Sequence, residues 1–98
     1  MARERSMRVA LRRWLDSAPL RRCSYETRRG YQTAAREAVV WTRRVHQEVS
    51  EVDEVPVRYL DVDKASATIA AVRRKHGPNV AERMRSVLDR ARAFDEVG

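Results

Sequence analysis

The amino-acid sequence predicts an all-α protein that folds as a single compact bundle of four helices. Its 98 residues include only three Gly and three Pro, and apolar residues recur at the spacing of a helix face instead of alternating as in a strand. An apolar share of 43% is enough for one core, and a chain of this length is too short for two. We therefore expect one helical domain over residues 1–98, with helices at about 3–16, 25–52, 64–76 and 80–96.

The first predicted helix, at about residues 3–16, is amphipathic. Its apolar residues follow the helical spacing: Met7, Leu11, Trp14, Leu15 and Ala18. Pro19 disfavours helical geometry at the residue before it, so the helix should end near Asp16 or Ser17. The residues from Leu20 to Cys23 are predicted to form a basic connector.

The second predicted helix, at about residues 25–52, begins after Ser24, which is a typical N-cap residue. One narrow seam of small side chains runs along it, consisting of Tyr31, Ala35, Ala38, Thr42, Val45, Val49 and Val52. We favour a helix that packs inside its own domain, because a homodimeric coiled coil normally has Leu or Ile at such positions. Gly30 lowers the helix propensity and marks either a bend or a close approach.

The third predicted helix follows the main connection of the chain, which is rich in acidic residues and contains Pro56. Within this connection, Val57 to Leu60 could form a short extended piece. Asp61 or Asp63 is expected to cap the third helix, at about 64–76. Its predicted inner face consists of Ala65, Ile69, Val72 and His76.

The fourth predicted helix, at about 80–96, has the clearest pattern in the sequence. Its apolar stripe consists of Val80, Met84, Val87, Leu88, Ala91 and Phe94. Gly77 and Pro78 are expected to end the third helix and start the fourth. Asn79 is predicted to be the N-cap, with Glu82 completing a capping box.

The net charge of +7 is distributed unevenly along the sequence. Residues 1–50 hold twelve Arg against five acids, a balance of +7, whereas the nine basic residues of 51–98 equal its nine acids. A basic surface of this kind is typical of proteins that bind polyanions such as nucleic acid. The alternative is a solvated surface that only keeps the protein in solution. The polar and basic side chains that lie off the apolar stripes are Arg29, Gln32, Arg36, Arg43, Arg83, Ser86 and Arg90.

Catalytic and metal-binding patterns are not found in the sequence. His46 and His76 have no second ligand at helical spacing, and no HExxH, CxxC or Gly-rich phosphate loop occurs. We therefore expect no metal, no cofactor and no enzymatic activity. Cys23 is the lone cysteine, which indicates a reducing, cytoplasmic setting. The longest apolar run, Ala38 to Trp41, is too short to cross a membrane, so no membrane partner is expected.

Four motifs occur in the order found in a known family of DNA-binding domains. They are Arg13-Trp14-Leu15-Asp16, Ser24-x-x-Thr27-x-x-x-Tyr31, Leu60-Asp61-Val62-Asp63, and the stretch from His76 to Leu88. Together they resemble the core-binding domain of tyrosine site-specific recombinases, especially phage integrases from high-GC actinobacteria and their phages. The resemblance covers about residues 7–94 and implies a SAM-like four-helix bundle that binds double-stranded DNA during recombination and integration.

The resemblance also implies which side chains approach DNA. In that family the second and fourth helices face the duplex, and the matching positions here are Thr27, Arg28, Gln32, Arg36, Asn79, Arg83, Ser86 and Arg90. The catalytic Arg, His and Tyr residues of the family have no counterpart, which again indicates no recombinase activity. The alternative function is a small helical protein-interaction module, or a phage-type regulator, that docks on a protein partner through the Val/Ala seam. The acidic connector and the neutral second half favour this alternative.

Overall fold

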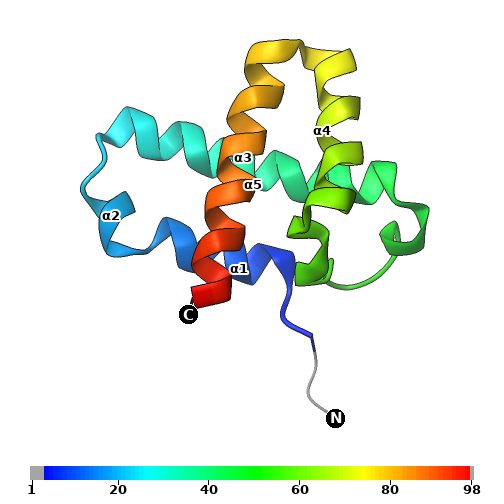
Figure 1. Ribbon diagram of the computed structural model, residues 1–98, viewed down its shortest axis with the longest axis horizontal. Helices are drawn as coiled ribbons and strands as arrows, with labels where there is room; N and C mark the ends of the chain where they lie inside the picture. Colours follow the sequence, from blue (N-terminus) through cyan, green and yellow to red (C-terminus); the bar gives the residue numbers. More distant parts are fainter. Residues whose placement is uncertain (1–3, 98) are drawn as a thin grey trace.

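The computed structural model describes residues 4–97, and this part of the chain is all-α, as the sequence predicts (Figure 1). Its helices are α1 (Met7–Leu15), α2 (Ala18–Arg21), α3 (Tyr25–Val45), α4 (Val62–His76) and α5 (Pro78–Val97). Two 3-10 turns, η1 (Gln47–Val49) and η2 (Val57–Leu60), lie between α3 and α4. The four longer helices correspond to the four predicted ones, and α2 is an additional single turn.

The helices form a flat bundle of 38 × 36 × 20 Å. Because neighbouring helices pack 8–10 Å apart, a thickness of 20 Å corresponds to two layers. α4 and α5 form an antiparallel hairpin, and α5 crosses both α3 and α1 (Figure 1). The tip of the hairpin, where α4 meets α5, projects beyond the other helices (Figure 1).

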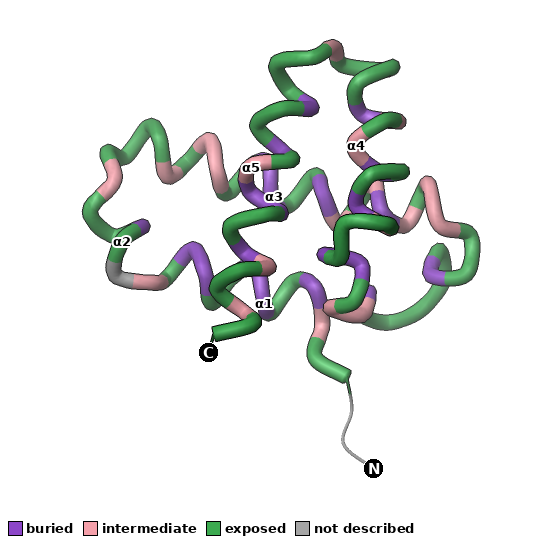
Figure 2. Tube along the Cα trace, in the orientation of Figure 1, coloured by how far each residue is buried: buried purple, intermediate pink, exposed green. Residues whose placement is uncertain are grey.

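The hydrophobic core lies where these helices cross, and buried positions recur along their inner faces (Figure 2). The largest side chains with less than 2% exposure include Met7 of α1, Tyr59 of η2, and Met84 and Leu88 of α5. Trp14 adds a ring that is 4% exposed. The predicted apolar stripe of α5 therefore faces the core. The exceptions are its two ends, Val80 and Phe94, which are exposed.

α1 is shorter than predicted at its start. The Oγ atom of Ser6 accepts a hydrogen bond from the N–H of Val9 at 3.0 Å, which makes Ser6 the N-cap and Met7 the first helical residue. Residue 3, where the prediction begins, lies outside the described residues. The helix ends at Leu15, close to the predicted end.

The predicted basic connector contains the short helix α2. Pro19 fits its first turn, where a missing N–H leaves no hydrogen bond unmade. Leu20 turns inward and is only 5% exposed. The burial of this one side chain explains why the segment is helical rather than irregular.

α3 begins after Ser24, as predicted, with the Ser24 Oγ accepting from the Thr27 N–H at 3.2 Å. It ends at Val45 and not at about residue 52, so this predicted boundary is wrong. The apolar spacing continues through Val49, but the chain leaves the helix at His46 and brings Val49 back into the core at 2% exposure. A 3-10 turn buries the same side chain that a longer helix would have presented.

The small-residue seam of α3 packs inside the domain, which is the preferred interpretation of the two. Ala35 is 5%, Ala38 0% and Thr42 1% exposed. The Thr42 hydroxyl donates to the Ala38 carbonyl oxygen at 2.7 Å, so no polar group is left unsatisfied there. Because these three side chains are buried, this part of the seam is not available to a protein partner.

Val57 to Leu60 forms the 3-10 turn η2, not an extended piece. The turn places Tyr59 in the core at 1% exposure, and the Tyr59 hydroxyl donates to a carboxylate oxygen of Glu48 at 2.9 Å. An extended chain would direct alternate residues to opposite sides, whereas Tyr59 and Leu60 are both buried.

The junction between α4 and α5 is where the sequence places it. Gly77 has a φ of 91° and ends α4, and Pro78 is the first residue of α5. The predicted capping box is wrong, because Asn79 lies inside α5 and the Ala81 N–H donates to the Gly77 carbonyl oxygen at 3.3 Å. α4 starts after Asp61, one of the two predicted cap residues, but the Asp61 side chain makes no capping hydrogen bond. Among the described helices, none is long and apolar enough to cross a membrane.

Candidate nucleic-acid interface

The four predicted α5 residues line a single surface groove of about 590 Å³. They are Asn79, Arg83, Ser86 and Arg90, and the groove also includes Tyr31, Glu82, Arg85 and Asp89. Their spacing of four, three and four residues places them on one helix face, which flanks the apolar stripe on the side toward α3. We call this surface the α5 groove. The four predicted residues supply two arginine guanidinium groups, an amide and a hydroxyl, which are donors suited to phosphate oxygens.

Arg83 lies directly on the backbone of α3. A Cβ atom added at Gly30 would lie 3.2 Å from the Nη1 atom of Arg83 and 3.7 Å from its Cζ atom. Of the two interpretations of Gly30, the close approach is therefore confirmed. Arg83 also borders a second groove of about 540 Å³ between α3 and α5, which contains Arg29 together with Glu26 and Glu37. Arg29 thus lines this second groove beside two carboxylates, and does not line the α5 groove.

Arg90 is held by an aromatic pair that the sequence analysis did not include in the site. The Arg90 Nη1 atom donates to the Tyr31 hydroxyl at 3.3 Å, and the guanidinium lies 5.9 Å from the centre of the Tyr31 ring. Tyr31 in turn packs on Trp14, with ring centres 5.7 Å apart. The sequence pattern places Tyr31 in the α3 seam. The signal that could have placed it at the site is its hydroxyl, because a tyrosine can bury its ring and still present a polar group at the surface.

Two predicted DNA contacts at the start of α3 have structural partners. The Thr27 hydroxyl accepts a hydrogen bond from the Ser24 hydroxyl at 2.8 Å, within the N-cap. Arg28 forms an ion pair with Asp16 at 3.2 Å and joins α3 to the end of α1. Both residues fix the start of α3, and neither borders the α5 groove.

Arg43 also has a structural role, and its prediction as a DNA contact is not supported by its position. Its guanidinium donates to the carbonyl oxygens of Val49 at 3.2 Å, Val52 at 2.6 Å and Asp53 at 3.1 Å. These carbonyl groups belong to the connection after α3, where the helix no longer supplies hydrogen bonds. Arg43 therefore holds the turn that ends α3 and has few donors left for a ligand.

Gln32 and Arg36 face a different groove from the α5 residues. They line a groove of about 570 Å³ between α1 and α3, together with Arg12 and the apolar residues Leu11, Leu15, Ala35, Val39 and Val40. The exposed side chains of Arg12 and Arg36 have no ion partner within residues 4–97. The predicted sites on α3 and α5 therefore divide between two faces.

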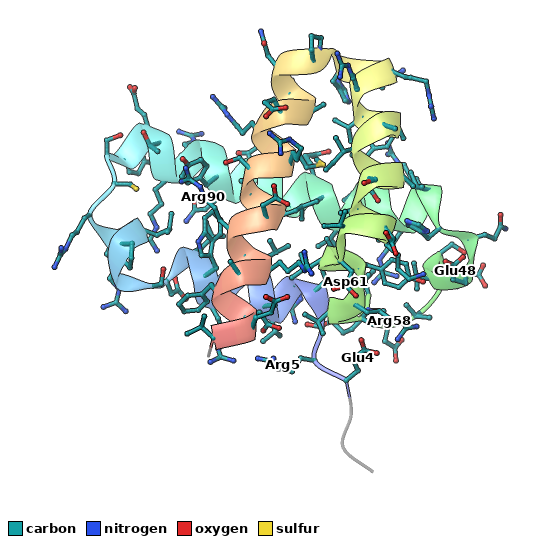
Figure 3. All side chains as sticks on the ribbon, in the orientation of Figure 1. Glu4, Arg5, Glu48, Arg58, Asp61 and Arg90 are labelled. Atoms are coloured by element: carbon teal, nitrogen blue, oxygen red, sulfur yellow. The ribbon has the colours of Figure 1, made fainter. Side chains whose placement is uncertain are left out.

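Ion pairing changes the distribution of charge that the sequence indicates. Arg5 pairs with Asp95 at 2.8 Å and Arg8 with Glu54 at 2.8 Å, so basic residues of the first half are neutralised by acids of the second. Glu4, Arg5, Arg58 and Asp61 gather on one side of the bundle, away from Arg90 (Figure 3). The basic residues of the second half that have no acidic partner within residues 4–97 are Lys64, Arg73, Arg74, Lys75, Arg83 and Arg90.

Both carboxylates of the α5 groove form ion pairs with the same arginine, Arg85. Arg85 forms ion pairs with Glu82 and, at 3.4 Å, with Asp89. The hydrogen bond from Arg85 holds the pKa of Glu82 below its ordinary value, although desolvation acts in the opposite direction. Since Arg85 is already engaged with these acids, Arg83 and Arg90 are the groove arginines whose charges remain available to an anion.

The histidines lie outside this groove. The His46 Nε2 atom lies 3.1 Å from the Lys64 carbonyl oxygen, and its ring packs on Tyr59. The His76 ring meets the Trp41 ring edge-on at 5.7 Å. Within the described part of the chain, no three His, Cys, Asp or Glu side chains are arranged to hold a metal ion.

Comparison of the chain with protein-family models, with curated proteins and with solved structures gave no match. The function proposed below therefore depends on the geometry and charge of the chain's own residues.

Proposed function

We propose that this protein binds double-stranded DNA through the α5 groove, as a helical module of the kind found in the core-binding domains of tyrosine recombinases. The observation that carries the proposal is the convergence of Asn79, Arg83, Ser86 and Arg90 in one groove. The sequence alone predicts all four as DNA contacts.

The chemistry of the groove supports a phosphate ligand. Arg83 and Arg90 supply charged donors, and both side chains are exposed. Each is braced on α3, Arg83 against the backbone at Gly30 and Arg90 against the Tyr31 hydroxyl. These contacts already restrict the two long side chains in the free protein, so binding costs less conformational entropy.

The charge of the groove supports a polyanion more than a single small anion. Glu82 and Asp89 balance part of the positive charge, leaving three arginines against two acids. A net charge of this size binds one isolated phosphate weakly. A duplex presents one negative charge per ~1.7 Å of its axis, so several weak contacts add along the surface.

Salt dependence of duplex binding tests this proposal. We expect the purified chain to bind a fluorescent random-sequence duplex of about 30 base pairs, with log Kd rising linearly with log salt between about 50 and 200 mM. Fluorescence anisotropy measures this directly. A chain that does not bind at the lowest salt, or binds equally at both concentrations, would contradict the proposal.

A further inference from the structure

The last turn of α4 carries three adjacent basic residues, Arg73, Arg74 and Lys75, which we call the α4–α5 tip. All three are exposed, and none has an acidic partner within residues 4–97. The sequence does not single them out, because residues 51–98 balance to zero charge. That balance is not local in space, since Asp95 and Glu54 pair with arginines of α1 and its N-terminal segment.

The tip adjoins the α5 groove. Only His76, Gly77 and Pro78 separate Lys75 from Asn79, the first groove residue of α5. The positive charge of Arg73 also contributes, after Arg85, to the lowered pKa of Glu82 in the groove, which indicates that Arg73 lies near the first turns of α5. The tip and the α5 groove therefore lie next to each other on the α4–α5 hairpin.

The length of the α5 groove matters for a duplex ligand. Residues 79 and 90 are eleven positions apart on α5, which corresponds to about 16 Å at 1.5 Å per residue. The major groove of DNA is about 12 Å wide, so the α5 groove is long enough to reach phosphates on both of its sides. Because the hairpin is antiparallel, the tip lies beside the first turn of α5 and widens the basic surface at that end.

Stabilisation of the end of α4 does not require all three charges. A cation near a helix C-terminus interacts favourably with the helix dipole, and this effect falls off within the last turn. Adjacent cations repel one another. The Glu82 carboxylate is near enough to Arg73 for its pKa to be lowered by that charge, but Glu82 is already paired with Arg85. An external polyanion would offset the repulsion that remains.

We propose that the α4–α5 tip is a second phosphate-contacting cluster, so that one chain contacts the duplex through the tip and the α5 groove together. This inference rests on the proposed DNA binding and extends it to residues outside the predicted site. The tip should therefore contribute to the salt dependence of duplex binding, because each phosphate contact contributes about 0.9 to the slope of log K against log salt.

The test compares two triple variants with equal loss of charge. The tip variant is Arg73→Gln, Arg74→Gln, Lys75→Gln. The matched control is Arg13→Gln, Arg21→Gln, Arg22→Gln. Its three arginines lie on α1 and at the end of α2, and they are also exposed. Anisotropy with the same random-sequence duplex should show the salt slope reduced by about 2 to 3 for the tip variant. The control should lose less than about one third of that amount.

Equal salt slopes for the tip variant and the unaltered chain would overturn the inference. Equal reductions of the slope in the two triple variants would overturn it as well, because they would show that only net charge matters. A third variant, Arg73→Lys with Arg74→Lys, keeps the charges and should keep the slope. Thermal melting verifies that each variant is folded at the assay temperature. Binding by the unaltered chain tests the proposed function separately, because that function fails only if this chain does not bind.

Discussion

Replacement of Arg83 and Arg90 by glutamate is expected to weaken duplex binding about 100-fold at about 0.1 M salt. Each phosphate contact contributes about 0.9 to the salt slope, so at this concentration one contact is worth nearly tenfold in affinity. The two arginines are the groove cations not engaged by Glu82 or Asp89. The measurement is the anisotropy titration of the double variant against the unaltered chain.

The control for this prediction is Arg21→Glu with Arg22→Glu, which makes the same change of net charge at the end of α2. Neither control residue borders the α5 groove. We expect the control to lose less than about tenfold in affinity through long-range electrostatics alone. If both double variants lose affinity equally, the α5 groove is not the binding surface.

Replacement of Tyr59 by alanine is expected to lower the free energy of unfolding by about 3–5 kcal/mol. The ring is 1% exposed and η2 places it in the core, so its removal leaves a cavity. The total stability of a domain of this size is about 5–15 kcal/mol, so the variant should be marginally folded. Urea unfolding followed by circular dichroism measures the difference, and a loss below about 1 kcal/mol would contradict the packing described for Tyr59.

The Tyr59 hydroxyl makes part of this stability dependent on pH. Burial of the phenol raises the pKa of Tyr59 above its ordinary value, and the hydrogen bond to Glu48 raises it further. The folded state therefore favours the protonated phenol, and the associated stability is present below the pKa of the unfolded chain, about 10. It is lost as the pH rises through the higher pKa of the folded state. Tyr59→Phe should be less stable than the unaltered chain at neutral pH, and the difference should shrink at alkaline pH.

The helix faces could be predicted from the sequence because apolar spacing reports directly on which side of a helix is buried. Met84, Leu88 and Ala91 illustrate this for α5. The α4–α5 junction was equally predictable from the sequence, because Gly at a positive φ and Pro at a first helical position have local conformational causes. In contrast, the end of α3 depends on Arg43 binding three carbonyl groups up to ten residues further along, and apolar spacing does not report such contacts.

The candidate site was predictable on α5 and only in part on α3. Side chains on one face of one helix stay together whatever the fold, which is why Asn79, Arg83, Ser86 and Arg90 share a groove. The assignment of α3 residues depended on how α3 crosses α1 and α5, so Gln32 and Arg36 face another groove. Which arginines are neutralised also depends on pairs distant in sequence, such as Arg5 with Asp95, and only the folded chain brings these together.

The most direct test of DNA binding through the α5 groove is an NMR titration of the isotope-labelled chain with the random-sequence duplex. Backbone amide signals and arginine side-chain signals would be followed at increasing duplex concentration. We expect the largest shifts at Asn79, Arg83, Ser86 and Arg90, with little change at Glu4 and Arg58, which pair with each other on the other side of the bundle. Shifts centred on Glu4 and Arg58, or on the groove between α1 and α3, would contradict the account.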